Sequence, residues 1–245
     1  MPVMIAKPYL GHNQDWINPF IEQFVRNIQT HNRSHYTACF RNWGYSHHNL
    51  LYRERTIYSL MSAAMHKLTP IHQSESSVIK RIDRRIPRNR GRERDQNGRV
   101  DLWAYKDGID YYFEFKRSYV GMSSLLDGYV PGRVHRPWTN LVEQIGQVRN
   151  SPDIGNEPDT CCIGMQIITP YKRGTDRDNL RNQEQVRSDE LENFIEQFRR
   201  TPDTVLWYRT DRLSRIIPIE WDENENESKW VLHPCHLFLF KIFST

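Results

Sequence analysis

The stretch from residue 99 to residue 118 constrains the fold more than any other part of the chain. Two runs rich in aromatic and β-branched residues flank Asp107-Gly108, and an Asp-Gly pair in that setting favours a two-residue type I′ turn. With this turn, Lys106 pairs with Ile109, and the same register places Asp101 directly opposite Glu114. The sequence therefore predicts a β-hairpin with two opposed carboxylates.

Alternation along the two strands divides the hairpin into a polar and an apolar face, because successive side chains point to opposite sides of a sheet. The face of Asp101 and Glu114 is expected to include Trp103, Tyr105, Tyr112 and Lys116. The other face is apolar enough to pack on helices and is expected to include Val100, Leu102, Ala104, Phe113 and Phe115.

Two carboxylates opposed across a strand pair repel each other, since their Cβ atoms are only about 4.5–5.5 Å apart. A shared proton, a basic neighbour or a divalent cation offsets that repulsion. Mg²⁺ is held by one or two carboxylates plus waters and substrate phosphate, and Lys116 is near enough to act at the same point. This combination suits metal-assisted hydrolysis of a phosphodiester. A solvated hairpin whose outer face carries Asp, Glu and Lys explains the same residues and stays open.

Asp101, followed by Glu114-Phe115-Lys116 on the next strand, resembles the PD-(D/E)XK nuclease superfamily, although Val100 stands where that family often has proline. The resemblance implies an α/β (α+β) fold with a restriction-endonuclease-like core. That core is a mixed sheet flanked by helices in the order α-β-β-β-α-β. The resemblance also implies that Asp101 and Glu114 hold Mg²⁺ or Mn²⁺ with the backbone carbonyl of Phe115. Lys116 is then expected to orient or activate the attacking water.

A helix is expected from about residue 47 to residue 68, and Glu54 lies on its apolar stripe. The stripe has helical period and contains Leu50, Leu51, Ile57, Tyr58, Met61, Met65 and Leu68. A carboxylate on the core-facing side of a helix is costly unless it is paired or bound to metal. The resemblance implies that Glu54 is an outer or second-metal ligand. A local ion pair with Arg53 or Arg55 is the alternative.

The run from Lys80 to Arg99 carries nine basic and three acidic residues. Arginine forks suit phosphate oxygens, so a basic run beside a phosphodiesterase strand indicates nucleic-acid binding. A solvated loop is the equally weighted alternative. The residues expected to contact nucleic acid are Arg84, Arg85, Arg88, Arg90, Arg92 and Arg117.

Around the hairpin, the patterns predict further elements in the order that the resemblance requires. Helices are expected at 15–30, 138–150 and 188–200, with Ser188 as the cap of the last. Strands are expected within 74–86 and at 161–169, 205–208, 216–221 and 231–243, with Pro170 ending the second of these. Residues 31–46 and 119–137 are expected to be loops. On the helix at 138–150, Gln144 and Gln147 are candidates to offer an accessory polar group. The whole chain, 1–245, is interpreted as one domain with a core at 47–170 and additions at 1–46 and 171–245.

Composition narrows the class of protein. No apolar run approaches the length that spans a bilayer, and the first ten residues do not resemble a secretory signal. The four cysteines show no C-x-x-C spacing, which fits a reducing compartment, so a cytoplasmic location without membrane contact is expected. His233, Cys235 and His236 match no zinc signature and are expected in or beside a strand.

The resulting hypothesis is a Mg²⁺- or Mn²⁺-dependent nuclease, an endonuclease, with DNA favoured over RNA as substrate. Homodimerisation is left open. Two rivals remain: a nucleic-acid-binding module that performs no chemistry, and an interaction module that keeps the same fold as a scaffold.

Overall fold

The computed structural model describes residues 2–11, 13–43, 54–80, 96–152, 154, 157, 159–174, 179–180, 186–210, 216–218 and 230–244. Within them the chain is a mixed α/β protein. Its helices are α1 (Gln14–Trp43), α2 (Glu54–His66), α3 (Met122–Leu126), α4 (Gly132–Arg149) and α6 (Ser188–Glu196). Its strands are β1 (Met4–Lys7), β2 (His72–Lys80), β3 (Gln96–Lys106), β4 (Ile109–Gly121), β5 (Thr160–Gly174), β6 (Thr204–Arg209), β7 (Ile216–Pro218), β8 (Trp230–Leu232) and β9 (Cys235–Ser244).

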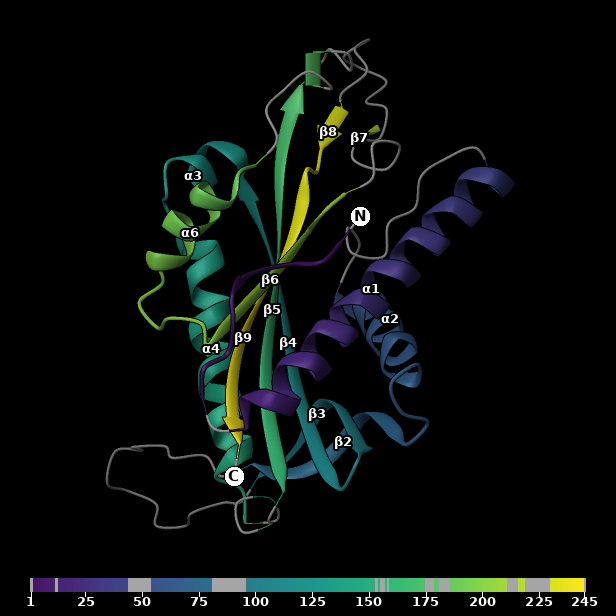
Figure 1. Cartoon of the computed structure of the whole chain (residues 1–245), viewed down its shortest axis with the longest axis vertical. Coiled ribbons are helices and arrows are strands. Elements are labelled where there is room, and N and C mark those ends of the chain that lie inside the picture. Colours follow the sequence, from purple (N-terminus) through teal and green to yellow (C-terminus); the bar gives the residue numbers. More distant parts are fainter. Residues whose placement is uncertain are drawn as a thin grey trace.

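One mixed sheet runs through the molecule in the order β1-β6-β9-β5-β4-β3-β2 (Figure 1). Neighbouring strands are antiparallel except β4 and β5, which are parallel and joined through α4. From α2 onward, the order is helix, three antiparallel strands, helix and strand, with the short α3 inserted after β4. This is the order of elements that the sequence patterns predict.

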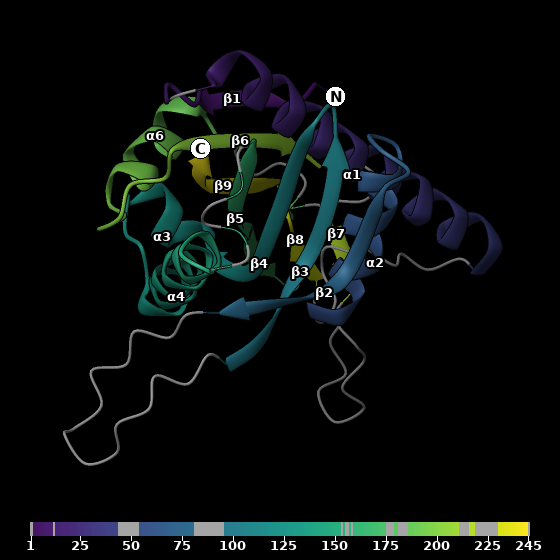
Figure 2. The ribbon, with the colours of Figure 1, turned by 90° about the horizontal axis from the view of Figure 1, so that it is seen from below.

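Helices cover both faces of the sheet (Figure 2). On the face covered by α1 and α2, Phe20 stacks on Tyr111 with ring centroids 4.0 Å apart. The ring centroids of Phe24 and Phe113 are 5.4 Å apart, and Phe115 belongs to the same core. On the other face, α3, α4 and α6 pack around the buried Trp138. The sheet is therefore the middle layer of three.

Strand β5 lies at the centre, between β4 and β9, and its residues from Thr160 to Pro170 are buried. A strand buried on both faces reads as a continuous apolar run, which is why its sequence is easily found. Pro170 does not end it, contrary to expectation. The ladder of β5 with β9 stops at Ile168, and its ladder with β8 starts at Lys172. Pro170, which has no N–H to donate, therefore lies where β5 changes from one antiparallel partner strand to the other.

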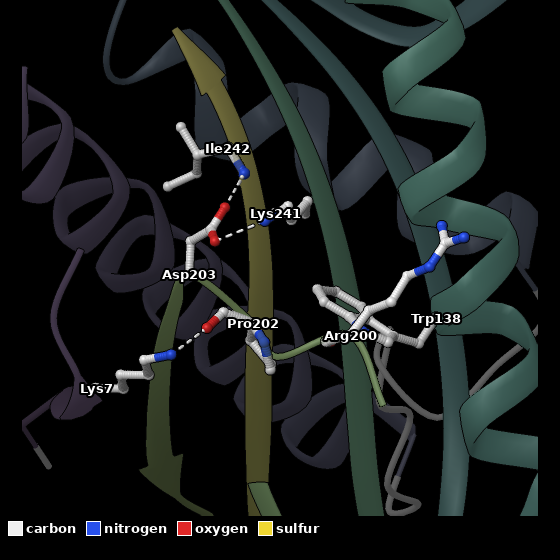
Figure 3. Close-up of polar contacts among 7 residues, drawn as sticks. All are labelled: Lys7, Trp138, Arg200, Pro202, Asp203, Lys241 and Ile242. Carbon is white, nitrogen blue, oxygen red and sulfur yellow. Dashed lines mark hydrogen bonds and ion pairs between the residues drawn. The ribbon is translucent and has the colours of Figure 1, made fainter. Parts of the chain in front are cut away.

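Hydrogen bonds join the segment between α6 and β6 to strands β9 and β1 and to helix α4 (Figure 3). The Asp203 carboxylate accepts hydrogen bonds from Lys241 Nζ and from the Ile242 amide, both at 2.8 Å. The Pro202 carbonyl accepts from Lys7, and the Arg200 carbonyl accepts from the Trp138 indole. These bonds fix β1 and β9 relative to α4.

Two regions expected to be loops contain helix. Helix α1 continues through residues 31–43, because Asn32 and Tyr36 extend the buried four-residue spacing of Phe24 and Ile28 with polar atoms. In the segment after the hairpin, β4 continues to Gly121, and α3 and the start of α4 follow. Pro137 is the sixth residue of α4.

The remaining differences are small. The N-cap of α6 is Arg187 and not Ser188, and the Glu190 carboxylate accepts the hydrogen bond of the Arg187 amide at 2.8 Å. The strand expected at 231–243 is two strands, β8 and β9, separated by His233-Pro234. Among the described residues, no helix is both long enough and apolar enough to cross a membrane.

Candidate active site

The hairpin has the expected turn. Asp107 and Gly108 both have positive φ, +53° and +88°, as a type I′ turn requires. The pairs run from Lys106 with Ile109 to Leu102 with Phe113. The predicted register is therefore confirmed over this part of the hairpin.

Beyond Leu102 the two strands of the hairpin part. Residues 96–100 of β3 pair with β2, and residues 114–121 of β4 pair with β5. Figure 2 shows the end of β2 and the start of β3 bent away from β4 toward α4. Asp101 and Glu114 thus occupy the first position on each strand after the β3–β4 pairing stops, a place that we call the fork.

Two hydrogen bonds orient the Asp101 carboxylate. Oδ2 accepts from the backbone amide of Phe115 at 2.7 Å, and Oδ1 accepts from the Tyr58 hydroxyl of α2 at 3.1 Å. A strand amide donates in the plane of its sheet, so Oδ2 takes the place that a β3 carbonyl would fill. The carboxylate therefore lies in the fork, and no simple alternation between faces determines its position.

The expected apolar face is wrong at Val100. This residue packs with Ile145 and Val148 of α4, whereas Leu102 and Ala104 pack under α1 and α2. The alternation breaks between them, where the pair Glu75–Asp101 is missing from the β2–β3 ladder and Glu75 has a φ of +54°. A positive φ is unusual for a non-glycine residue, so the distortion beside Asp101 stores strain.

Glu114 is 3% exposed and lies between Phe113 and Phe115, which both face α1 and α2. Alternation directs its side chain, with that of the partly buried Lys116, to the α4 side. The residue beside Glu114 on β5 is Gly164. A Cβ atom at Gly164 would stand 3.1 Å from Leu141 Cγ and 3.2 Å from Ile145 Cγ2, so this glycine allows α4 to approach the sheet closely.

The structure distinguishes between the two candidate glutamines of α4. Gln144 lies one turn before Val148, on the side of α4 that faces the diverging β3. Its Oε1 atom is buried with no hydrogen-bond partner in the described part of the chain, whereas Gln147 shows no such atom. The Oε1 atom of Gln166, the neighbour of Lys116 on β5, is also buried without a partner among the described residues. Two side-chain carbonyl oxygens on the α4 side of the sheet thus lack donors in the part of the chain that the structure describes.

Of the other residues predicted for the site, only Arg117 has a side chain that the structure describes. Glu54 is the first residue of α2, one turn before Tyr58, but its side chain lies outside the described residues. Arg84, Arg85, Arg88, Arg90 and Arg92 also lie outside them. Arg117 is on β4, three residues beyond Glu114 and on the same face as Phe115.

Outside the fork, the histidines and cysteine near the start of β9 have structural partners, as expected of residues in or beside a strand. His236 shares a 3.0 Å hydrogen bond with Thr169, and His233 Nδ1 lies 3.2 Å from the Pro170 carbonyl oxygen. Burial raises the pKa of the Cys235 thiol, so this group stays protonated at neutral pH. Among the described side chains, no three of His, Cys, Asp or Glu form a group that could hold a metal ion.

Two residues with structural roles at the fork are missed by sequence reasoning. Tyr58 reads as one more apolar member of a helical stripe, and Gly164 as one residue of a buried strand. A hydroxyl within a core-facing stripe is the signal that could have identified Tyr58, because buried hydroxyls need partners. No local signal marks Gly164, since its role depends on a helix that precedes it by some twenty residues.

Comparison with known proteins adds nothing to this picture: no family model, no curated protein and no solved structure matches the chain.

Proposed function

We propose that this protein is a metal-dependent nuclease that hydrolyses phosphodiester bonds of DNA at the fork, acting as an endonuclease. The observation that carries the proposal is the position of Asp101 and Glu114. They are the first residues beyond the paired part of the hairpin, with Lys116 two residues further along β4. Carboxylates and an amine held on strands of a rigid sheet suit chemistry on a charged phosphodiester.

The arrangement of elements supports the same proposal. A helix, three antiparallel strands, a helix and a strand parallel to the third form the segment from α2 to β5. This agrees with the α-β-β-β-α-β order that the resemblance to the PD-(D/E)XK superfamily implies. We therefore propose a restriction-endonuclease-like core, extended at one edge by β9, β6 and β1.

The donor set at the fork fits Mg²⁺ or Mn²⁺. Glu114 is a carboxylate that is only 3% exposed, and Mg²⁺ needs only one or two carboxylates beside its waters. The amide of Phe115 points into the fork, and its carbonyl points the same way, since both groups of a strand residue face one neighbouring strand. Asp101, Glu114 and the Phe115 carbonyl would hold the ion, with Glu54 as a further carboxylate. When bound, such an ion polarises the phosphate and its attacking water.

Two further residues, Lys116 and Tyr58, would act at the site without binding the metal ion. Lys116, as a cation beside Glu114, would balance charge on the phosphate and orient the attacking water. Tyr58 positions Asp101 through its hydroxyl, in the manner of the outer hydrogen-bond partners that fix metal ligands.

The test is incubation of the purified full-length protein with plasmid, linear duplex, single-stranded DNA and RNA, in Mg²⁺, in Mn²⁺ and in chelator. Cleavage of DNA that depends on the metal supports the proposal, and nicking or linearisation of the plasmid identifies an endonuclease. Binding to nucleic acid without cleavage under any condition favours the inactive binding module. Absence of both cleavage and binding favours the interaction module.

A further inference from the structure

Three arginines and two tyrosines form a contiguous group where β4 and β5 end, and we call it the arginine–tyrosine cluster. The Arg117 guanidinium lies over the Tyr119 ring, with Cζ 4.3 Å from the ring centroid. The Tyr119 ring meets that of Tyr171 edge-on, with centroids 6.4 Å apart. Arg133 and Arg173 lie over the Tyr171 ring at 5.8 Å and 5.9 Å, and Arg133 donates to its hydroxyl at 3.3 Å.

The cluster is built from parts of the chain that are far apart in sequence. Arg117 and Tyr119 come from β4, Tyr171 and Arg173 from β5, and Arg133 from the second position of α4. The pairing of Gly121 with Tyr171 brings the ends of the two parallel strands together, in the upper part of Figure 1. Regular elements thus hold these side chains in place.

Arg117 is the most unusual member of the cluster. Its Nε and Nη2 atoms are buried without a hydrogen-bond partner, and none of the ion pairs among the described residues includes it. Burial lowers the pKa of Arg117 to about 10, so the group is still cationic at neutral pH. A buried guanidinium with no anion among the described residues is costly, and a phosphate of a bound ligand would offset that cost.

The ring faces and the remaining arginines indicate what kind of anion fits. Tyr119 and Tyr171 are partly buried, and Arg133 and Arg173 are exposed. Aromatic rings and guanidinium planes are surfaces on which unpaired bases stack, and arginine donors match phosphate oxygens.

We propose that the arginine–tyrosine cluster binds an unpaired stretch of nucleic acid, with phosphates on the arginines and bases stacked on the tyrosines. The inference rests on the proposed nuclease function, because it assigns a substrate class to that nuclease: DNA with a single-stranded segment. Arg117 lies three residues beyond Glu114 on β4 and on the opposite face of the sheet, so the cluster is a separate contact region and not part of the fork.

The test measures affinity and not cleavage. Fluorescence anisotropy with a labelled oligothymidylate, in chelator, gives the dissociation constant of the full-length protein for single-stranded DNA. Tyr171→Ala should weaken binding from about 5-fold to about 150-fold, the range for loss of one stacked base. Tyr171→Phe keeps the ring and should bind within about 3-fold of the parent. Arg117→Met should weaken binding without lowering the melting temperature, because it removes a buried charge that has no ion-pair partner in the described part of the chain.

Tyr105→Ala is the matched control, because Tyr105 is an exposed strand tyrosine beside the hairpin turn. It should bind like the parent, and a blunt duplex of the same length should respond little to any of these changes. Parent-like affinity in both Tyr171→Ala and Arg117→Met overturns the inference, as does an equal loss for duplex.

Cleavage assays on the same variants separate this inference from the proposed nuclease function. A parent that binds single strands through the cluster but never cuts refutes the nuclease and leaves the binding site standing. If the parent cuts DNA while the cluster variants bind like the parent, the nuclease function stands and the binding site at the cluster is refuted.

Discussion

At the scale of single residues, the fork depends on one carboxylate that takes the place of a backbone group. The amide of Phe115 loses its β3 partner where the strands part, and Asp101 Oδ2 accepts its hydrogen bond instead. A hydrogen bond to a charged group contributes about 1.5–3 kcal/mol, more than the neutral bond that it replaces. The divergence of the strands is thus stabilised by the residue that the proposed chemistry needs.

The proposed roles of Glu114 and Lys116 predict opposite effects on metal affinity. Glu114→Gln should abolish cleavage and weaken Mg²⁺ or Mn²⁺ binding, since a neutral amide lacks the charge that holds a hard cation. Lys116→Ala should lower cleavage about 10²–10⁴-fold and leave metal affinity equal or slightly higher, because a nearby positive charge is gone. Isothermal titration calorimetry measures the first quantity and a plasmid assay the second. Parent-like cleavage in both variants would rule out the fork as the catalytic site.

Tyr58→Phe tests whether Asp101 is positioned by α2. Loss of the hydroxyl removes the 3.1 Å hydrogen bond while keeping the ring in the core. We expect metal affinity or activity to fall about 10–100-fold, as for other residues that orient metal ligands. Tyr105→Phe, on an exposed position of β3, is the control and should behave like the parent. Equal values for the two variants would show that Asp101 needs no support from α2.

At the scale of elements, the approach of α4 to the sheet determines the shape of the site on the side of Glu114. A methyl group at Gly164 would require Leu141 or Ile145 to shift by a few tenths of an ångström. Protein interiors are packed densely enough that such a contact transmits any added volume into the helix position. The α4 side of the fork, with Gln144 and Lys116, is therefore sensitive to a residue that performs no chemistry.

Two glycine-to-alanine substitutions test how closely α4 packs against the sheet. Gly164→Ala should lower the free energy of unfolding by about 1–3 kcal/mol through overpacking and should also reduce activity. Gly146→Ala, within α4, meets no atom within 4 Å and should raise the free energy of unfolding by up to about 1 kcal/mol. Urea denaturation followed by circular dichroism measures both. A neutral Gly164→Ala with full activity would contradict the close packing of α4.

At the scale of the whole molecule, the N- and C-terminal segments complete the sheet. Strands β9, β6 and β1 continue it beyond β5, so β5 becomes a central strand buried on both faces. Asp203 and Lys7 fasten this extension to the segment before β6. The core from α2 to β5 thus has one edge covered by its own chain.

The distribution of charge along the chain predicts how DNA binding depends on salt. The formal net charge is only +4, yet nine basic residues lie between Lys80 and Arg99. If Arg84, Arg85, Arg88, Arg90 and Arg92 contact phosphates, alanine at several of them should weaken binding to all duplex sequences alike. Each lost contact should reduce the slope of log K against log salt by about 0.9. A slope unchanged from that of the parent would assign the run to a solvated loop.

Sequence alone determined the hairpin, its register from Lys106–Ile109 to Leu102–Phe113, and the order of the elements around it. The Asp107-Gly108 turn is a local signal, and the alternation of apolar residues fixes which strand positions face α1 and α2. The buried run of β5 and the helical periods of α1 and α4 are equally local. Such features depend on neighbours within a few residues, so they can be read along the chain.

Tertiary structure decided how the site residues are held. Asp101 is oriented by an amide on another strand and by a hydroxyl forty-three residues away, and Val100 changes face because the ladder is distorted at Glu75. The close approach of α4 at Gly164 and the meeting of Arg117 with Tyr171 through Tyr119 likewise join distant segments. These contacts form only when the sheet assembles, because no local pattern specifies which residues a diverging strand will meet.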